Sequence, residues 1–319
     1  MSRIFDALQR SGTEQSGIEY PDMVSVITEV FEAPRAQASA SRATADSEPP
    51  ISAPPIQVRE IQIPQASMTE APAQVTEQVT ESTAPAEFPS VQVSVTTSSR
   101  LVFFTEPDSL AAEKFRFLGV RLRQLRQSRP LKKVLITSTI PEEGKSLVSA
   151  NLAGVLSRRK QKVLLLEGDL RRPTLAQQFG LGRLAGLGEW LQSGQQTPSN
   201  IYHVGGSGFW LMPAGSPPAN PLELMQSGRL SQLMGQLENL FDWIVVDSPP
   251  LLPLADTTVW ARFTDGTLLV AREGKTQKKS LQRGLEMLKK SDLLGVVLNG
   301  CTGSDHESYY QRYSPQGTK

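Results

Sequence analysis

One stretch of the sequence has the residue types and spacing of a phosphate-binding loop. Residues 139–146 read TIPEEGKS, follow the apolar run 134–137 and open a pattern typical of a helix over 145–159. In such a loop, successive backbone N–H groups surround an anion, and the helix N-terminus adds a partial positive charge. We expect Lys145 to reach the β- and γ-phosphates of a nucleotide and the Ser146 hydroxyl to ligate Mg²⁺. The residues expected to contact the nucleotide here are Pro141, Glu142, Glu143, Gly144, Lys145, Ser146 and Leu147.

The stretch departs from the general phosphate-loop pattern at one position. The pattern has glycine five residues before Gly144, where this chain has Thr139. The alternative interpretation is therefore an ordinary strand–turn–helix that binds no phosphate.

Carboxylates follow two other apolar runs. Glu167 and Asp169 come after residues 163–166, and Asp247 comes after residues 243–246. Ligands bind at the C-terminal ends of parallel strands. Because residues two apart point the same way in an extended backbone, we expect Glu167 and Asp169 to face together, one orienting Mg²⁺ and one accepting a proton from a hydroxyl. Asp247 would hold Mg²⁺. The alternative for the first pair is a surface turn with an aspartate as helix N-cap.

Three further polar residues lie beside these motifs. Arg171 and Arg172 follow the first carboxylate pair, where they would bind phosphate or flank a turn. Asn299 ends the last apolar run, where it would meet the nucleotide base or cap the strand.

The elements that must position these residues follow an alternating pattern. Strands are predicted at 134–137, 163–166, 209–212, 243–246, 267–271 and 293–298, and helices at 109–127, 145–159, 221–239 and 277–290. Continuous apolar strands alternating with helices favour a mostly parallel sheet with helices on both faces. We therefore predict an α/β fold of the P-loop NTPase type, preceded by a disordered N-terminal segment.

Charge divides the chain into two unlike parts. The 319 residues carry a net charge of +1, but residues 1–99 hold −8 and no lysine, whereas residues 100–319 hold +9. The N-terminal part is rich in Pro, Ala, Ser and Thr, and it has too few apolar side chains to offset the entropy lost on ordering. The predicted organisation is a short helical or docking segment at 1–33, a disordered linker at 34–99, a P-loop domain at 100–303 and a tail at 304–319.

Composition argues against several classes of protein. The sequence has no apolar run of about 18 residues and no signal-peptide core at its start, so we expect neither a membrane span nor export. Its single cysteine, Cys301, excludes an internal disulfide framework. Its two histidines, His203 and His306, argue against a histidine-rich metal site.

The polar tail concentrates aromatic hydroxyl groups. Tyr309, Tyr310 and Tyr313 are three of the five tyrosines in the chain. Exposed tyrosines in a tail can enter an active site as phosphoacceptors. The alternative is an amphipathic tail that packs on the domain or on a neighbour.

In this order, the motifs resemble those of the bacterial tyrosine autokinases of capsule and exopolysaccharide assembly. The resemblance covers residues 101–302 and rests on an ordered set of short motifs. They are EKFR (113–116), PEEGKS (141–146), LRRP (170–173), GLGEWL (186–191), PAG (213–215), NPLEL (220–224), DSPP (247–250), Asp256, DG (265–266) and GVVLN (295–299). The start, SRIFDAL (2–8), looks like that of autokinases from exosortase-linked systems.

The resemblance implies an enzyme that uses ATP and Mg²⁺ to phosphorylate its own tail tyrosines and other protein tyrosines. It implies catalytic roles for Lys145, Glu167, Asp169 and Asp247, and metal binding by Ser146, Asp169 and Asp247. The family has an aspartate where this chain has Glu167, which would still act as the base. Tyr309, Tyr310 and Tyr313 would be the autophosphorylation sites.

The resemblance also implies an assembly at a membrane. Glu113 and Arg116 match a helix motif that supports self-association, but the third position is Gly119 instead of arginine, which puts ring formation in doubt. A separate transmembrane polysaccharide co-polymerase would activate the kinase. The chain is then expected to be cytoplasmic and peripheral at the inner face of the plasma membrane, with no nucleic acid as partner.

Two other functions remain open from the sequence. A partitioning-type ATPase of the ParA or MinD kind would carry a second lysine near the start of the phosphate loop, and residues 138–143 have none. A non-catalytic scaffold that binds nucleotide and regulates polysaccharide export would explain both Glu167 and Gly119.

Overall fold

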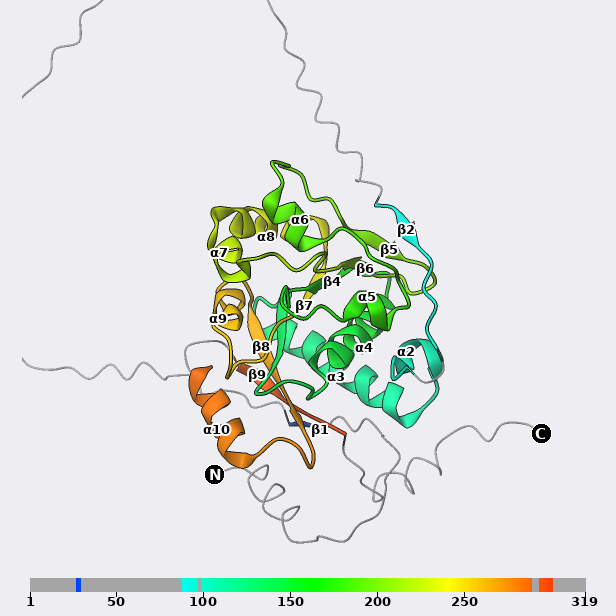
Figure 1. Ribbon diagram of the computed structural model, residues 1–319. Coiled ribbons are helices and arrows are strands. Elements are labelled where there is room, and N and C mark those ends of the chain that lie inside the picture. The colour runs from blue at the N-terminus through cyan, green and yellow to red at the C-terminus, as the bar shows by residue number, and fades with distance from the viewer. Residues whose placement is uncertain (1–26, 30–87, 97–98, 289–292, 301–319) are drawn as a thin grey trace, which may run out of the picture. The chain divides into compact units, whose positions relative to one another are not determined.

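The computed structural model describes residues 27–29, 88–96, 99–288 and 293–300. Within this part of the chain, nine strands form one sheet in the order β1-β9-β8-β3-β7-β4-β6-β5-β2 (Figure 1). The central strands are parallel, and antiparallel pairs occur between β5 and β6 and between β1 and β9. The predicted α/β fold with a mostly parallel sheet is confirmed.

The central strands are the apolar runs of the sequence. They are β3 (Lys133–Ser138), β4 (Val163–Glu167), β7 (Trp243–Asp247), β8 (Gly266–Arg272) and β9 (Leu293–Asn299), with β6 (Trp210–Met212) and β5 (Tyr202–Val204) beyond β4. Most of their side chains are buried, because helices cover both faces of the sheet.

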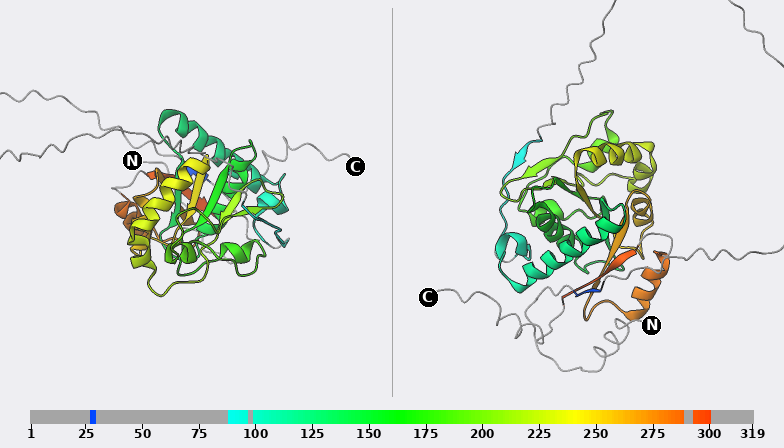
Figure 2. Two further views of the ribbon diagram at one scale, coloured as in Figure 1. Left: turned by 90° about the horizontal axis from the view of Figure 1, so that it is seen from above. Right: turned by 180° about the vertical axis from the view of Figure 1, so that it is seen from behind.

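Alternation along the strands separates the interior into two layers. Val134 and Ile136 of β3 pack with α2 (Val102–Thr105), α3 (Leu110–Ser128), α4 (Lys145–Ser157) and α5 (Leu175–Gln178). Leu135 points to the opposite face, which is covered by α6 (Leu187–Gln192), α7 (Pro221–Gln226), α8 (Gly228–Leu240) and α9 (Asp256–Ala261). A third cluster lies under α10 (Lys278–Met287) beside β8 and β9. Figure 2 shows helices on both sides of the sheet.

The structure differs from the sequence predictions at one helix and at the end of the linker. The helix expected over 221–239 is two helices, α7 and α8, because Ser227 adopts an extended backbone between them. The linker was expected to extend to residue 99, but β2 (Ser90–Val91) pairs with β5, and Phe88 stacks on Phe241 with ring centroids 6.2 Å apart.

The N-terminal segment 1–33 contributes one described element. The strand β1 (Ile27–Glu29) pairs with β9, where the sequence suggested only a helical or docking segment. The rest of that segment, residues 34–87 of the linker and the tail 304–319 lie outside the described residues, as do Cys301 and His306. None of the helices in the described part of the chain combines the length and apolar character needed to cross a bilayer.

Candidate functional site

The loop between β3 and α4 has the backbone of an anion-binding turn. Gly144 precedes the first helical residue with φ of 93°, and Glu142 also has a positive φ of 64°. A Cβ atom at Gly144 would lie 2.0 Å from the Nδ2 atom of Asn299, so a larger residue would displace that side chain. The positive φ and the close approach of the Asn299 side chain together explain why this position is glycine.

Glu143 holds the loop from inside. Its fully buried carboxylate accepts hydrogen bonds from the Thr139 hydroxyl and the Ile140 N–H, each 2.9 Å long, and from the Thr276 hydroxyl. Its carbonyl accepts a 2.9 Å hydrogen bond from Asn299. Thr139, which departs from the general motif, is thus part of the bracing. Glu143 was expected to contact the nucleotide, and Asn299 to meet the base or cap the strand; in this structure both contact the loop.

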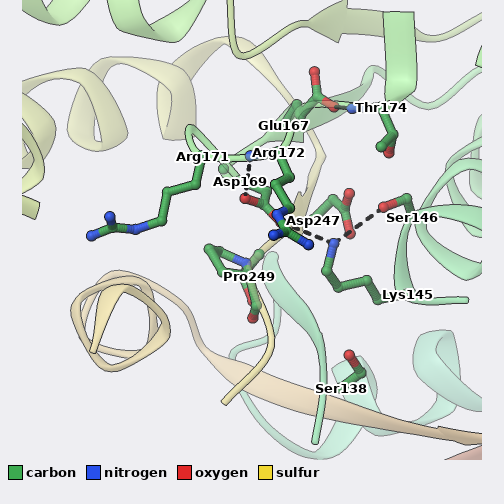
Figure 3. Close-up of polar contacts among 12 residues, drawn as sticks. Ser138, Lys145, Ser146, Glu167, Asp169, Arg171, Arg172, Thr174, Asp247 and Pro249 are labelled. Atoms are coloured by element: carbon green, nitrogen blue, oxygen red, sulfur yellow. Dashed lines mark hydrogen bonds and ion pairs between the residues drawn. The ribbon is translucent and has the colours of Figure 1, made fainter. Parts of the chain in front are cut away.

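Lys145 lies among the carboxylates that follow β4 and β7. Its ammonium nitrogen is 3.1 Å from the Asp169 carboxylate and 3.4 Å from the Ser146 hydroxyl. Burial alone would lower the pKa of Lys145, but Asp247 and Asp169 outweigh that effect and raise it above the ordinary value. The first turn of α4, Asp169 and Asp247 therefore meet at one point (Figure 3).

Asp247 is the one of these carboxylates that lacks a full set of partners. It is completely buried; one carboxylate oxygen accepts from Ser149 at 3.3 Å, and the other has no hydrogen-bond partner. Burial raises the pKa of Asp247 against the opposing effect of Lys145. An orphaned carboxylate oxygen beside the Ser146 hydroxyl suits a hard cation such as Mg²⁺, which takes oxygen ligands and keeps several waters.

Glu167 does not face the same way as Asp169. Its carboxylate accepts hydrogen bonds from the backbone N–H groups of Thr174, Leu175 and Ala214, at 2.5, 2.7 and 3.0 Å. Burial raises the pKa of Glu167, and these three donors oppose the rise. The expectation that both carboxylates point together is wrong, because the backbone leaves the extended conformation after β4. Figure 3 shows the Glu167 carboxylate directed toward Thr174.

The two arginines after Asp169 also diverge. Arg171 forms a bidentate ion pair with the buried Asp256, with distances of 2.7 and 3.1 Å. Arg172 donates its backbone N–H to Asp169 at 3.0 Å, and its guanidinium has no ion-pair partner in the described residues. In Figure 3 the Arg172 side chain extends on the side of Lys145, whereas that of Arg171 extends away.

A cavity of about 560 Å³ opens in front of this cluster. Its lining includes all the predicted loop residues except Glu143, together with Asp169 and Arg171. Arg172, for which phosphate binding was one of two expected roles, also lines it, and the residues that the sequence analysis did not assign to the nucleotide site are Thr174, Gln178, Pro250, Pro253 and Leu254. Pro250 belongs to a quoted motif, but nothing local in the sequence marks Gln178 or Leu254, which the fold brings in from α5 and from the turn after β7.

The residues expected to support self-association lie on α3. Glu113 and Arg116 form an ion pair within the helix, and Arg116 also bonds to the Pro107 carbonyl. Gly119 is buried against α4, and a Cβ atom there would lie 2.8 Å from a methyl group of Val155. The three tail tyrosines fall outside the described residues.

Comparison with known proteins gives consistent relatives, although no protein-family model matches the chain. The tyrosine-protein kinase YwqD of Bacillus subtilis is 34% identical over 211 residues, which cover 66% of this chain and 89% of YwqD. The putative tyrosine-protein kinase CapB of Staphylococcus aureus is 31% identical over 219 residues, which cover 68% of this chain and 96% of CapB. The tyrosine-protein kinase etk of Escherichia coli is 33% identical over 196 residues, but the match spans only 27% of its length.

Solved structures give the same result. The chimerical protein CapA2B2 superposes with a TM-score of 0.61 and 28% identity, covering 68% of this chain and 96% of that one. The kinase domain of the Escherichia coli tyrosine kinase ETK superposes with a TM-score of 0.60 and 32% identity, covering 63% of this chain and 79% of that one. This likeness in sequence and fold, over a domain built around a phosphate-binding loop, shows that the chain belongs to the family of bacterial tyrosine-protein kinases.

Proposed function

We propose that this kinase uses ATP and Mg²⁺ to phosphorylate its own tail tyrosines, Tyr309, Tyr310 and Tyr313, and thereby regulates polymerisation and export of an exopolysaccharide or capsule. The observation that carries the proposal is that Lys145 and Asp169, with the buried Asp247 behind them, meet beside a cavity lined by the phosphate loop. Family membership supplies the reaction class, and the cavity supplies room for a nucleotide.

The loop and two cations would bind the triphosphate. The backbone N–H groups at the start of α4 and the Lys145 ammonium would contact the phosphate oxygens, and Arg172 would add a second cation from the opposite wall. Ser146 and Asp247 would hold Mg²⁺, which supplies charge neutralisation at the phosphate oxygens. Their positions fit this role because one oxygen of the buried Asp247 lacks a partner.

Asp169 would accept the proton of the tyrosine hydroxyl. It would also lie close enough to help hold Mg²⁺. It lines the cavity, whereas Glu167 is held by three backbone N–H groups and lines a separate depression. We therefore assign Glu167 to positioning: it fixes the turn at Thr174 and the strand end at Ala214, and so orients the segment that carries Asp169.

The proposed setting is the inner face of the plasma membrane, where a separate transmembrane polysaccharide co-polymerase would recruit and activate the kinase. Protein tyrosines, those of neighbouring copies first, would be the substrates. Phosphate on a tail tyrosine adds about two negative charges, which changes how the tail binds a basic surface of a neighbour.

A phosphosite map tests the proposal. The full chain is incubated with ATP and Mg²⁺, with and without a membrane activator, and phosphotyrosine is mapped by mass spectrometry. Tail phosphotyrosine is expected in the wild type and in a Lys279→Ala control, and a loss of at least about a hundredfold is expected in Lys145→Ala. Equal signal in Lys145→Ala, or no tail phosphotyrosine under either condition, contradicts the proposal.

A further inference from the structure

The end of the domain opposite the nucleotide cavity carries a dense group of cations. The turn between α4 and β4 contains Arg158, Arg159, Lys160 and Lys162, and the C-terminal half of α3 adds Arg123 and Arg126 beside it. We name these six residues the basic surface. No acidic residue occurs in the sequence between Glu113 and Glu142 or between Glu143 and Glu167, so neither segment supplies a carboxylate to neutralise them.

The two segments of the basic surface are joined through the start of β7. The Arg126 guanidinium lies 4.8 Å from the Trp243 ring and donates to the Asp242 carbonyl at 3.0 Å. The Asp242 carboxylate in turn accepts from the backbone N–H of Lys162 at 2.8 Å. These contacts hold the Arg126 side chain and the Lys162 backbone in place without forming an ion pair.

Like charges are held together in this surface. Arg123 donates to the Val155 carbonyl at 3.2 Å and lies near Arg159; burial first, and then the charge of Arg159, lowers the pKa of Arg123. Among the described residues, none of the six cations forms an ion pair with a carboxylate. The four cations of the turn are exposed. The Arg158 guanidinium also lies over the Phe103 ring, 5.1 Å from its centroid.

Helix capping does not account for this arrangement. The C-terminal end of a helix offers roughly half a negative charge and so favours one or two nearby cations. Six cations from one helix and a turn exceed that, and their mutual repulsion works against the folded state unless an anionic partner relieves it. A cluster of six cations without carboxylate partners therefore favours contact with an external anionic surface.

We propose that the basic surface binds the headgroups of an anionic phospholipid bilayer. A bilayer suits it better than nucleic acid because the Trp243 ring beneath Arg126 is fully buried and cannot stack on bases. Four long cationic side chains in a five-residue turn instead resemble the short basic clusters that are attracted to anionic leaflets.

Docking in this way leaves the active site open. Lys162 precedes the first residue of β4, and Glu167 is its last, so the length of the strand, roughly 16 Å, separates the basic surface from the catalytic end of the sheet. The kinase would thus lie on the bilayer with its nucleotide cavity directed away from the lipid. Attraction to lipid would add to, and act independently of, any protein activator.

Vesicle binding tests the proposal on the full chain. Cosedimentation with mixed phosphatidylglycerol–phosphatidylcholine vesicles is compared for the wild type and for the triple variant Arg158→Gln, Arg159→Gln, Lys160→Gln. The wild type is expected to bind the anionic vesicles but not pure phosphatidylcholine, and the triple variant to bind roughly a hundredfold more weakly. Binding by the wild type is also expected to weaken as salt rises to ~0.15 M and above.

A matched variant controls for net charge. Arg183→Gln, Lys279→Gln, Arg283→Gln removes three exposed cations that lie elsewhere, and its vesicle affinity is expected to stay within about threefold of wild type because attraction falls off within a Debye length. Circular dichroism and thermal unfolding confirm that both variants fold. Equal loss in the two triple variants, equal binding to neutral vesicles, or tighter binding to a DNA duplex than to anionic vesicles at the same salt overturns the proposal.

Discussion

The ammonium nitrogen of Lys145 lies 3.1 Å from the carboxylate of Asp169, which joins the phosphate loop to the segment after β4. This ion pair is largely shielded from water, with side-chain exposures of 13% and 6%. Because the same ammonium group is expected to contact phosphate oxygens, nucleotide binding should draw Lys145 from Asp169 and leave that carboxylate free to accept a proton. The pair therefore links nucleotide binding to the proposed base.

Substitutions of Asp169 and Glu167 are expected to have different effects, because Asp169 is the proposed catalytic base and Glu167 a positioning residue. Asp169→Asn should lower the autophosphorylation rate at least about a hundredfold, because it removes the group that accepts the proton. Glu167→Gln places an amide N–H₂ group against backbone donors, so it should lower the free energy of unfolding by about 1–3 kcal/mol. Single-turnover phosphorylation and urea unfolding of both variants measure this. A Glu167→Gln variant that is as stable as wild type but as inactive as Asp169→Asn would show that Glu167 is the catalytic base.

Neighbouring arginines should show opposite defects. Arg172→Gln removes a cation from the cavity and should raise the KM for ATP about tenfold, with little effect on stability. Arg171→Gln leaves the buried Asp256 carboxylate without its ion pair and should cost about 2 kcal/mol of stability, less than for a fully buried pair because Arg171 is 37% exposed. Steady-state kinetics gives the KM for ATP and denaturant unfolding gives the stability of both variants. An unchanged KM for ATP in Arg172→Gln argues against a contact between Arg172 and the phosphates.

Restoring the self-association motif should harm the fold. Gly119→Arg introduces a side chain whose Cβ atom would lie 2.8 Å from Val155, so we expect the free energy of unfolding to fall by about 1–3 kcal/mol. The matched control is Val120→Arg, one residue along α3, where the side chain is 41% exposed and the change should stay within about 0.5 kcal/mol. Thermal and urea unfolding measure both. Equal free energies of unfolding for the two variants would contradict this prediction and show that α3 and α4 can move apart to accommodate the arginine.

Glu189 should make the free energy of unfolding of the domain depend on pH. Burial opposes ionisation, but the N–H groups of Ser216 and Gly186, each 2.8 Å from the carboxylate, outweigh it and lower the pKa of Glu189 below its ordinary value. The stabilisation is therefore complete above the unfolded-state pKa and is lost as pH falls through the lower folded-state pKa. Glu189→Gln should cost about 1 kcal/mol near neutral pH, and the difference from wild type should shrink toward acid pH. Urea unfolding across pH measures it, and a difference that grows toward acid pH contradicts this account.

The central architecture is determined by local pattern. The apolar runs that form β3, β4, β7, β8 and β9 are continuous enough to require burial on both faces, and the helices between them follow from periodicity. The phosphate loop was also recognisable, because an anion-binding turn before a helix needs glycine and lysine at set spacing. Likewise, carboxylates at strand ends had to gather at one edge of a parallel sheet.

Which way each side chain points was decided by the tertiary structure. Glu167 and Asp169 are two residues apart, but the backbone turns after β4, and three N–H groups from distant segments take up the Glu167 carboxylate. Glu143 is directed inward by Thr276, which lies far away in the sequence. The extent of the domain was likewise decided by long-range contacts, since Phe88 joins it through Phe241. Sequence spacing sets which residues can meet, whereas hydrogen-bond satisfaction and packing between distant segments select which of them do.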